Sequence, residues 1–114
     1  MGRILTISSV VLPKHPQRRN QRTSRTALVR YNAALSLAAF RDPAGRDELR
    51  AMLQPKSDGT PPPDNQVWEA LRALFLVGTA SDLDAVTRYA RGVAGMPARI
   101  QQQALLTARE IENR

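Results

Sequence analysis

The 114-residue sequence contains no cysteine, so disulfide bonds, thiolate nucleophiles and cysteine-based metal sites are excluded. Aromatic residues make up only 4% of the chain although hydrophobic residues make up 42%, so Ala, Leu and Val must supply most of the core. Ala and Leu are strong helix formers, and Ala lets helix axes approach closely. The composition therefore favours closely packed helices, in a chain whose length allows one domain and little more.

Residues that carry catalytic chemistry are also scarce. The only histidine, His15, stands before Pro16 without a carboxylate nearby in the sequence to orient it as a base. Two acidic pairs, Asp47-Glu48 and Asp82/Asp84, fall in predicted first turns of helices, where negative charge is expected anyway. Glycine-rich phosphate loops, paired-histidine zinc motifs and serine-nucleophile elbows are missing. We therefore expect no enzymatic activity, no cofactor, no metal site and no small-molecule substrate.

No apolar run is long enough to span a membrane, since about 20 residues are needed. The longest, Ile4–Leu12, has nine residues, includes Ser and Thr, and lacks a small-residue cleavage site, so it is a poor signal peptide. We interpret it as an extended, β-prone segment that packs on a partner; a truncated anchor is the alternative. We expect a cytoplasmic protein, or one peripheral to a membrane complex.

The net charge of +7 is unevenly distributed. Residues 1–30 contain seven Lys or Arg and no Asp or Glu, whereas residues 31–114 contain ten of each. Residues 14–25 also lack hydrophobic periodicity, so we predict an irregular, extended arm over 1–25 and a helical domain over 26–114. Within the arm we predict that partner contacts are made by Ile4, Ile7, Val11, Lys14, Arg18, Arg19, Arg22 and Arg25.

Start and stop signals predict five helices in the domain. Asp42-Pro43 and Gly78 end the first and third, and a proline-rich loop over 54–63 separates the second from the third. Asp64 and Ser81 are the predicted N-caps of the third and fourth. The first helix is apolar on more than one side, so we expect neighbours to cover it on several sides. The predicted spans are Thr26–Phe40, Pro43–Leu53, Asn65–Val77, Asp82–Arg91 and Pro97–Asn113.

An internal repeat relates these helices. An offset of 37 residues superposes the first two pairs, and a further offset of 34 brings Ala70 onto Ala104 and Leu74 onto Ala108. Such periods indicate stacked helical hairpins. Because Tyr31 and Trp68 share a repeat position, we expect them to pack between helices. The pairs matched by the offset of 37 are Tyr31 with Trp68, Ala33 with Ala70, Leu37 with Leu74, Phe40 with Val77, and Leu49 with Val86.

Residues 29–45, Val-Arg-Tyr-Asn-Ala-Ala-Leu-Ser-Leu-Ala-Ala-Phe-Arg-Asp-Pro-Ala-Gly, followed by Leu-Arg-Ala-Met-Leu at 49–53, closely resemble a HEAT-like repeat. Val67 to Ala90 resemble a looser second copy, and Met96 to Arg114 the first helix of a third. The resemblance covers about residues 26–114. It implies an all-α fold, a short right-handed superhelix of about five helices, used in this family as a protein-binding scaffold and in some members for nucleic acid.

The resemblance also implies a concave face lined by the second helix of each hairpin, to which Arg46, Arg50, Arg88 and Arg91 would contribute; a solvated face is the simpler interpretation of these four. Solenoids normally need about three repeats to be stable alone. With two and a half, we expect this chain to function docked to a larger protein complex.

Three interpretations of the basic arm remain open. An acidic groove on a protein partner comes first. An anionic membrane surface, with Ile4–Leu12 as the hydrophobic anchor, is a variant of this first interpretation. Nucleic-acid phosphates, which such a basic cluster would neutralise, come second. The arm has no aromatic residue for base stacking, which argues against sequence-specific or single-strand recognition. An inert, solvated leader is the third interpretation.

Overall fold

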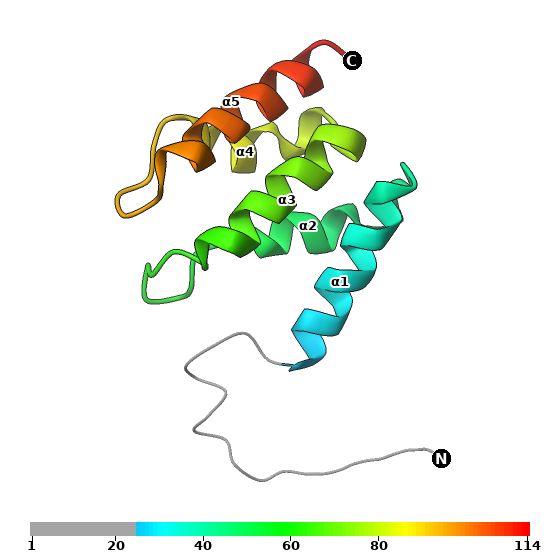
Figure 1. Ribbon diagram of the computed structural model, residues 1–114, viewed down its shortest axis with the longest axis horizontal. Coiled ribbons are helices and arrows are strands. Elements are labelled where there is room, and N and C mark those ends of the chain that lie inside the picture. Colours follow the sequence, from blue (N-terminus) through cyan, green and yellow to red (C-terminus); the bar gives the residue numbers. More distant parts are fainter. Residues whose placement is uncertain (1–24) are drawn as a thin grey trace, which may run out of the picture.

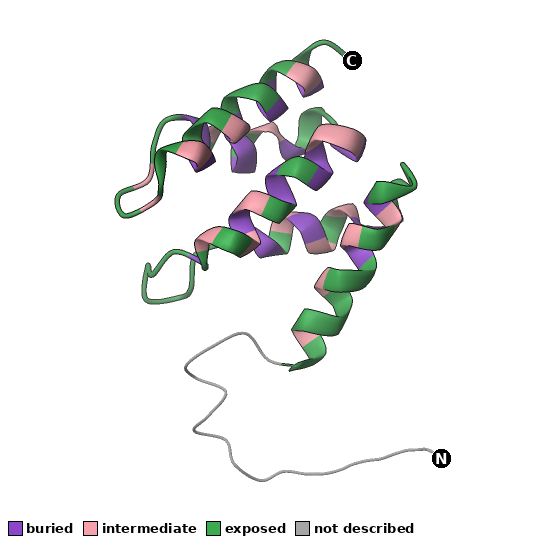
Figure 2. Ribbon diagram, in the orientation of Figure 1, coloured by how far each residue is buried: buried purple, intermediate pink, exposed green. Residues whose placement is uncertain are grey.

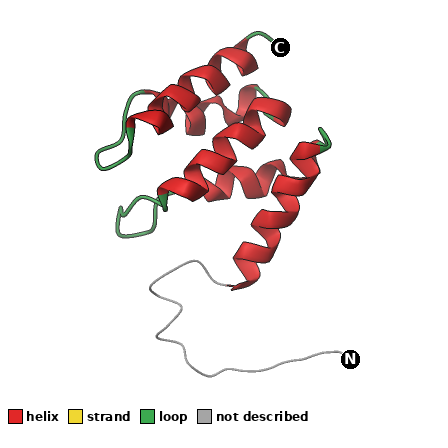
Figure 3. Cartoon of the chain, viewed as in Figure 1, coloured by secondary structure: helices red, strands yellow, loops and turns green. Residues whose placement is uncertain are grey.

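The structure, a computed structural model, describes residues 25–114. This range folds into helices joined by loops, and it contains no strand (Figure 3). The predicted all-α class with about five helices is confirmed. The α-helices are α1 Arg25–Ala39, α2 Arg46–Met52, α3 Asp64–Val77, α4 Leu83–Ala90 and α5 Ala98–Glu112, and the short 3-10 helices are η2 Pro43–Gly45 and η3 Ala80–Asp82.

The helices form two layers of a short superhelix. In the first layer α3 packs against α1 on one side and α5 on the other (Figure 1). In the second, α2 packs against α1 and α3, and α4 packs against α5. The predicted arrangement of two helical hairpins followed by a single helix is therefore correct. Pro63 and Pro97 precede α3 and α5 with the same extended backbone, in agreement with the predicted offset of 34.

A single apolar core fills the space between the layers (Figure 2). Alanines such as Ala38, Ala70 and Ala104 are fully buried, so the helices approach closely where the chain lacks aromatic bulk. Gly45 serves the same purpose: a Cβ atom there would lie 2.7 Å from the Cα and Cβ atoms of Ala34. The larger fully buried side chains include Leu49, Leu53, Leu71, Leu74, Val86, Tyr89 and Ile100.

Two predicted N-caps are wrong. Asp64 is the first residue of α3, after Pro63, and does not cap it. Ser81 lies inside η3, whose N-cap is Thr79; Asp82 completes a capping box there, because its Oδ2 accepts a hydrogen bond from the Thr79 backbone N–H at 2.8 Å. The difference arises because a 3-10 turn precedes α4 and moves the helical start towards Thr79. The predicted second helix likewise divides into η2 and α2.

The expectation that the first helix is covered on several sides is also wrong. Only Ala34 and Ala38 of α1 are buried, while Val29 is 63% and Phe40 86% exposed. The helix ends with Arg41 in the left-handed region at φ 60°, where the Asp42 backbone N–H donates to the Leu37 carbonyl. Helix α1 is therefore an edge helix whose outer side has no neighbour within residues 25–114.

Candidate interaction surface

An apolar groove runs across the layer of α1, α3 and α5. It has a volume of about 590 Å³ and is lined by Leu35 and Ala38 of α1, by Ala73 and Leu76 of α3, and by Leu106 of α5. Leu106 is 50% exposed, so its side chain is open to a partner.

A second cavity of about 310 Å³ extends the groove towards the start of α1. Its apolar lining comes from Leu28, Tyr31 and Met52. Leu35 and Glu69 line both cavities, so the two are adjacent. Together they form a surface which we call the first-layer groove.

Charged side chains stand in the first-layer groove, and one of them, Arg72, contacts the ring of Trp68. Glu69 and Arg72 of α3 stand among its apolar residues. The ring of Trp68 lies beneath two guanidinium groups, with Arg99 at 4.8 Å and Arg72 at 5.8 Å from the ring centroid. Trp68 and Tyr31 are both half-buried against the core, so their predicted packing role is confirmed.

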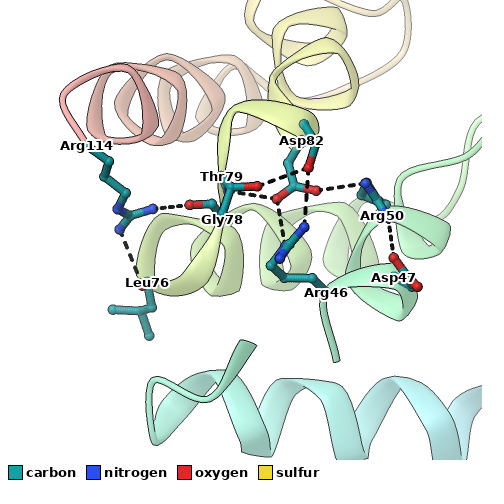
Figure 4. A network of polar contacts seen from close by, with 9 residues as sticks. Arg46, Asp47, Arg50, Leu76, Gly78, Thr79, Asp82 and Arg114 are labelled. Carbon is teal, nitrogen blue, oxygen red and sulfur yellow. Dashed lines mark hydrogen bonds and ion pairs between the residues drawn. The ribbon is translucent and has the colours of Figure 1, made fainter. Parts of the chain in front are cut away.

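The second layer carries a buried ion-pair network (Figure 4). Asp82 is fully buried; its Oδ2 lies 3.3 Å from Arg46 Nε and its Oδ1 lies 3.4 Å from Arg50 Nη1. Arg50 also pairs with Asp47, and Arg46 donates to the Ser81 hydroxyl at 3.2 Å. The interpretation of Arg46 and Arg50 as a solvated surface is therefore corrected, because both hold the hairpins together.

Three further side-chain hydrogen bonds join consecutive repeats, and sequence reasoning missed them. The Tyr89 hydroxyl donates to the Leu53 carbonyl at 2.6 Å, and the Thr107 hydroxyl to the Leu71 carbonyl at 2.8 Å. Arg114 donates to the Gly78 carbonyl at 2.6 Å at the end of α3 (Figure 4). Each donor stands 36 residues after its acceptor, but the acceptors are backbone carbonyls of apolar residues, so the sequence carries no signal for these bonds. Burial also raises the pKa of Tyr89.

The other predicted site residues are placed as follows. Arg88 and Arg91 are exposed on and beside α4. Arg25 is the exposed first residue of α1. The remaining predicted arm contacts, Ile4, Ile7, Val11, Lys14, Arg18, Arg19 and Arg22, lie outside the described residues.

Within the described part of the chain, Asp, Glu and His side chains form no group that could hold a metal ion. None of the helices there combines the length and hydropathy needed to cross a membrane.

We compared the sequence with models of known protein families. Residues 29–55, which span most of α1 and all of α2, match the model of the PBS lyase HEAT-like repeat. The first hairpin of this chain is a HEAT-like repeat. The match covers the first hairpin, and α3 to α5 continue its architecture. No curated protein matches the chain, and no solved structure does. HEAT-like repeats are helical modules that typically mediate protein interaction.

Proposed function

We propose that the protein is a non-catalytic scaffold or adaptor subunit that mediates protein–protein interaction within a larger, cytoplasmic assembly. The observation that supports this function best is the first-layer groove, about 590 Å³ in its larger part, which leaves apolar side chains of three helices open to solvent. Contiguous exposed apolar surface of this kind is typical of binding sites. An apolar segment of the partner fills the groove, and the basic arm threads onto the same partner.

Two neighbouring leucines of α5 offer a matched test of the groove. Leu106 lines it and is 50% exposed, whereas Leu105 is 49% exposed and does not line it. We expect Leu106→Asp to lose the proteins that co-purify with the full-length chain, while Leu105→Asp retains them. Both variants should keep the same melting temperature, because both positions are already solvated. Equal retention by the two variants would count against the groove.

A second candidate function, a nucleic-acid-binding module, is favoured by the seven Lys or Arg and no acidic residue of residues 1–30. Comparing the full-length protein with a shortened chain that begins at Thr26 separates the two functions. We expect protein partners to be lost with the arm and nucleic-acid retention to be unchanged. If nucleic acid departs with the arm and protein partners remain, the order of the two functions is reversed.

A further inference from the structure

The outer side of α1 carries an apolar stripe that the groove does not use. Val29, Ala33 and Leu37 follow one another at spacings of four residues, which places them on one face of α1, and Phe40 comes three residues later, directly after the helix ends at Ala39. Val29 is 63% and Phe40 86% exposed, Ala33 is exposed and Leu37 half-buried. We call these four residues the edge face. Figure 2 shows the contrast between the largely exposed α1 and the buried positions along α3.

The internal repeat shows what this stripe does elsewhere in the fold. The repeat counterparts of Ala33, Leu37 and Phe40 are Ala70, Leu74 and Val77 of α3. All three are buried, and α3 lies between α1 and α5 (Figure 1). The same stripe is thus covered in the middle helix and open in the edge helix. Because the corresponding residues of α3 pack against neighbouring helices, we expect the same residues of α1 to be able to pack against a helix as well.

The positive charge of α1 restricts which kind of helix can bind to the edge face. Helix α1 contains Arg25 and Arg30 but no acidic residue, and Arg41 follows it. Residues 1–41 as a whole contain eight Lys or Arg and no Asp or Glu. A second copy of the chain would bring like charges together around the edge face, and so would the chain's own basic arm. A helix bordered by carboxylates would instead meet opposite charge on both sides.

Two carboxylates stand beside these cations, Asp42 next to Arg41 in the sequence and Glu48 opposite Arg30. Asp42 accepts a hydrogen bond from the Ala44 backbone N–H at 3.0 Å. Glu48 lies 3.9 Å from Arg30, and both of these side chains are more than a third exposed, so their pairing is weak.

The backbone of Arg41 supplies an independent observation. At φ 60° it occupies the position after a helix that glycine normally takes, and a side chain there is unfavourable. The chain therefore retains a cation beside Phe40 where the backbone alone would favour glycine. Such strained positions concentrate at binding sites.

We propose that the edge face of α1 binds an amphipathic helix of a partner protein whose apolar stripe is flanked by Asp and Glu. The groove lies along Leu35 and Ala38, on a different side of α1, so the edge face is a second docking surface. The inference goes beyond the proposed scaffold function, and either surface can fail its test without the other.

The test uses the full-length chain and two designed peptides, each of roughly 18 residues and about 27 Å long as a helix. Both have the same Leu and Ala stripe; one is flanked by Glu and the other by Lys. We expect the Glu peptide to bind, as fluorescence anisotropy would show, and the Lys peptide not to bind. Three further measurements test whether something else occupies the edge face. They are binding to vesicles of phosphatidylserine and phosphatidylcholine, binding to double-stranded DNA, and sedimentation of the protein alone, which detects self-association.

Substitutions then locate the site. Val29→Ser and Phe40→Ser together should weaken Glu-peptide binding by about tenfold, whereas Leu105→Ser on α5 should have no effect. Arg41→Gly should weaken it about threefold and flatten its salt dependence, yet raise the melting temperature because glycine relieves the backbone. A variant that is more stable but binds less cannot owe its defect to unfolding.

Several results would overturn the proposal. One is equal binding of both peptides, and another is Glu-peptide binding that ignores Val29→Ser and Phe40→Ser. Loss of vesicle binding, of DNA binding or of self-association in the Val29→Ser, Phe40→Ser variant would assign the face to that other occupant. A large gain in peptide affinity when Ile4, Ile7 and Val11 are replaced by Ser would assign it to the chain's own arm.

Discussion

The carboxylate of Asp82 joins the two hairpins through Arg46, whose Nε lies 3.3 Å from Asp82 Oδ2. Asp82 is fully buried, whereas the Arg46 side chain keeps 27% of its surface exposed. Removing a carboxylate from water is costly, and Asp82 offsets that cost with the Thr79 N–H and with a second guanidinium, that of Arg50. The same group therefore completes the capping box before the second helix of the second hairpin and ties that hairpin to the first.

Replacing Asp82 with Ala should destabilise the fold by about 2–4 kcal/mol, since both the cap and the cross-repeat ion pairs are lost. Asp84, an exposed acid in the first turn of α4, is the matched control, and Asp84→Ala should cost less than about 1 kcal/mol. Urea denaturation monitored by circular dichroism gives both values. Equal losses would mean that Asp82 acts only as first-turn charge.

The Tyr89 hydroxyl provides a second prediction, which depends on pH. Tyr89→Phe should lower the free energy of unfolding by about 1 kcal/mol near neutral pH, because the Leu53 carbonyl loses its donor.

The same substitution should change the stability profile in alkali. Burial raises the pKa of Tyr89 above its ordinary value of 10.0 in the folded state. As pH rises, the unfolded chain therefore loses the Tyr89 proton before the folded chain does. The free energy of unfolding that this proton supports is fully present below pH 10.0 and is lost as pH rises through the higher pKa of the folded state. Unfolding measured across this range should show a steeper fall for the unaltered protein than for Tyr89→Phe.

The sequence predicted the helices well because their ends depend on local signals. Asp42 and Pro97 act within one or two residues of the boundaries they set, and hydrophobic periodicity covers the rest. The cap before α4 was missed because Thr79, Ser81 and Asp82 are all suitable N-cap residue types, and the capping box joins Thr79 to Asp82. The ion pairs of Asp82 with Arg46 and Arg50 come from another hairpin, which local sequence does not show.

The surface was harder to predict than the fold, for a related reason. Apolar positions on α1 and α3 have the same pattern, but α3 has a neighbour on each side and α1 does not. Periodicity shows which residues can be buried, and only the order of helices in space shows that Phe40 is exposed and Val77 is not. The edge face and the groove both follow from that order.

Two glycines allow the steric cost of adding a Cβ atom to be measured separately from the cost of an unfavourable backbone conformation. Gly45 has a negative φ of −95°, so any residue could adopt its backbone, but an added Cβ would collide with Ala34. Gly95 has φ +86° and nothing within 4 Å of an added Cβ. We expect Gly45→Ala to cost about 1–3 kcal/mol through displaced helices and Gly95→Ala about 1–2 kcal/mol through backbone strain. Thermal unfolding measures both, and only Gly45→Ala should alter the near-ultraviolet signal of the aromatic side chains.

Thr107 supplies the last prediction, because its hydroxyl is a buried polar group in an otherwise apolar interface. It donates to the Leu71 carbonyl at 2.8 Å and accepts from Gln103 Nε2 at 3.2 Å. Thr107→Val keeps the shape of the side chain and removes both bonds, so it should destabilise the fold by about 1–2 kcal/mol. Thr107→Ser keeps the hydroxyl and removes a methyl group, which should cost about 1 kcal/mol. If Val proved as stable as Thr in chemical denaturation, the Thr107 hydroxyl would contribute nothing to the packing of α5 on α3.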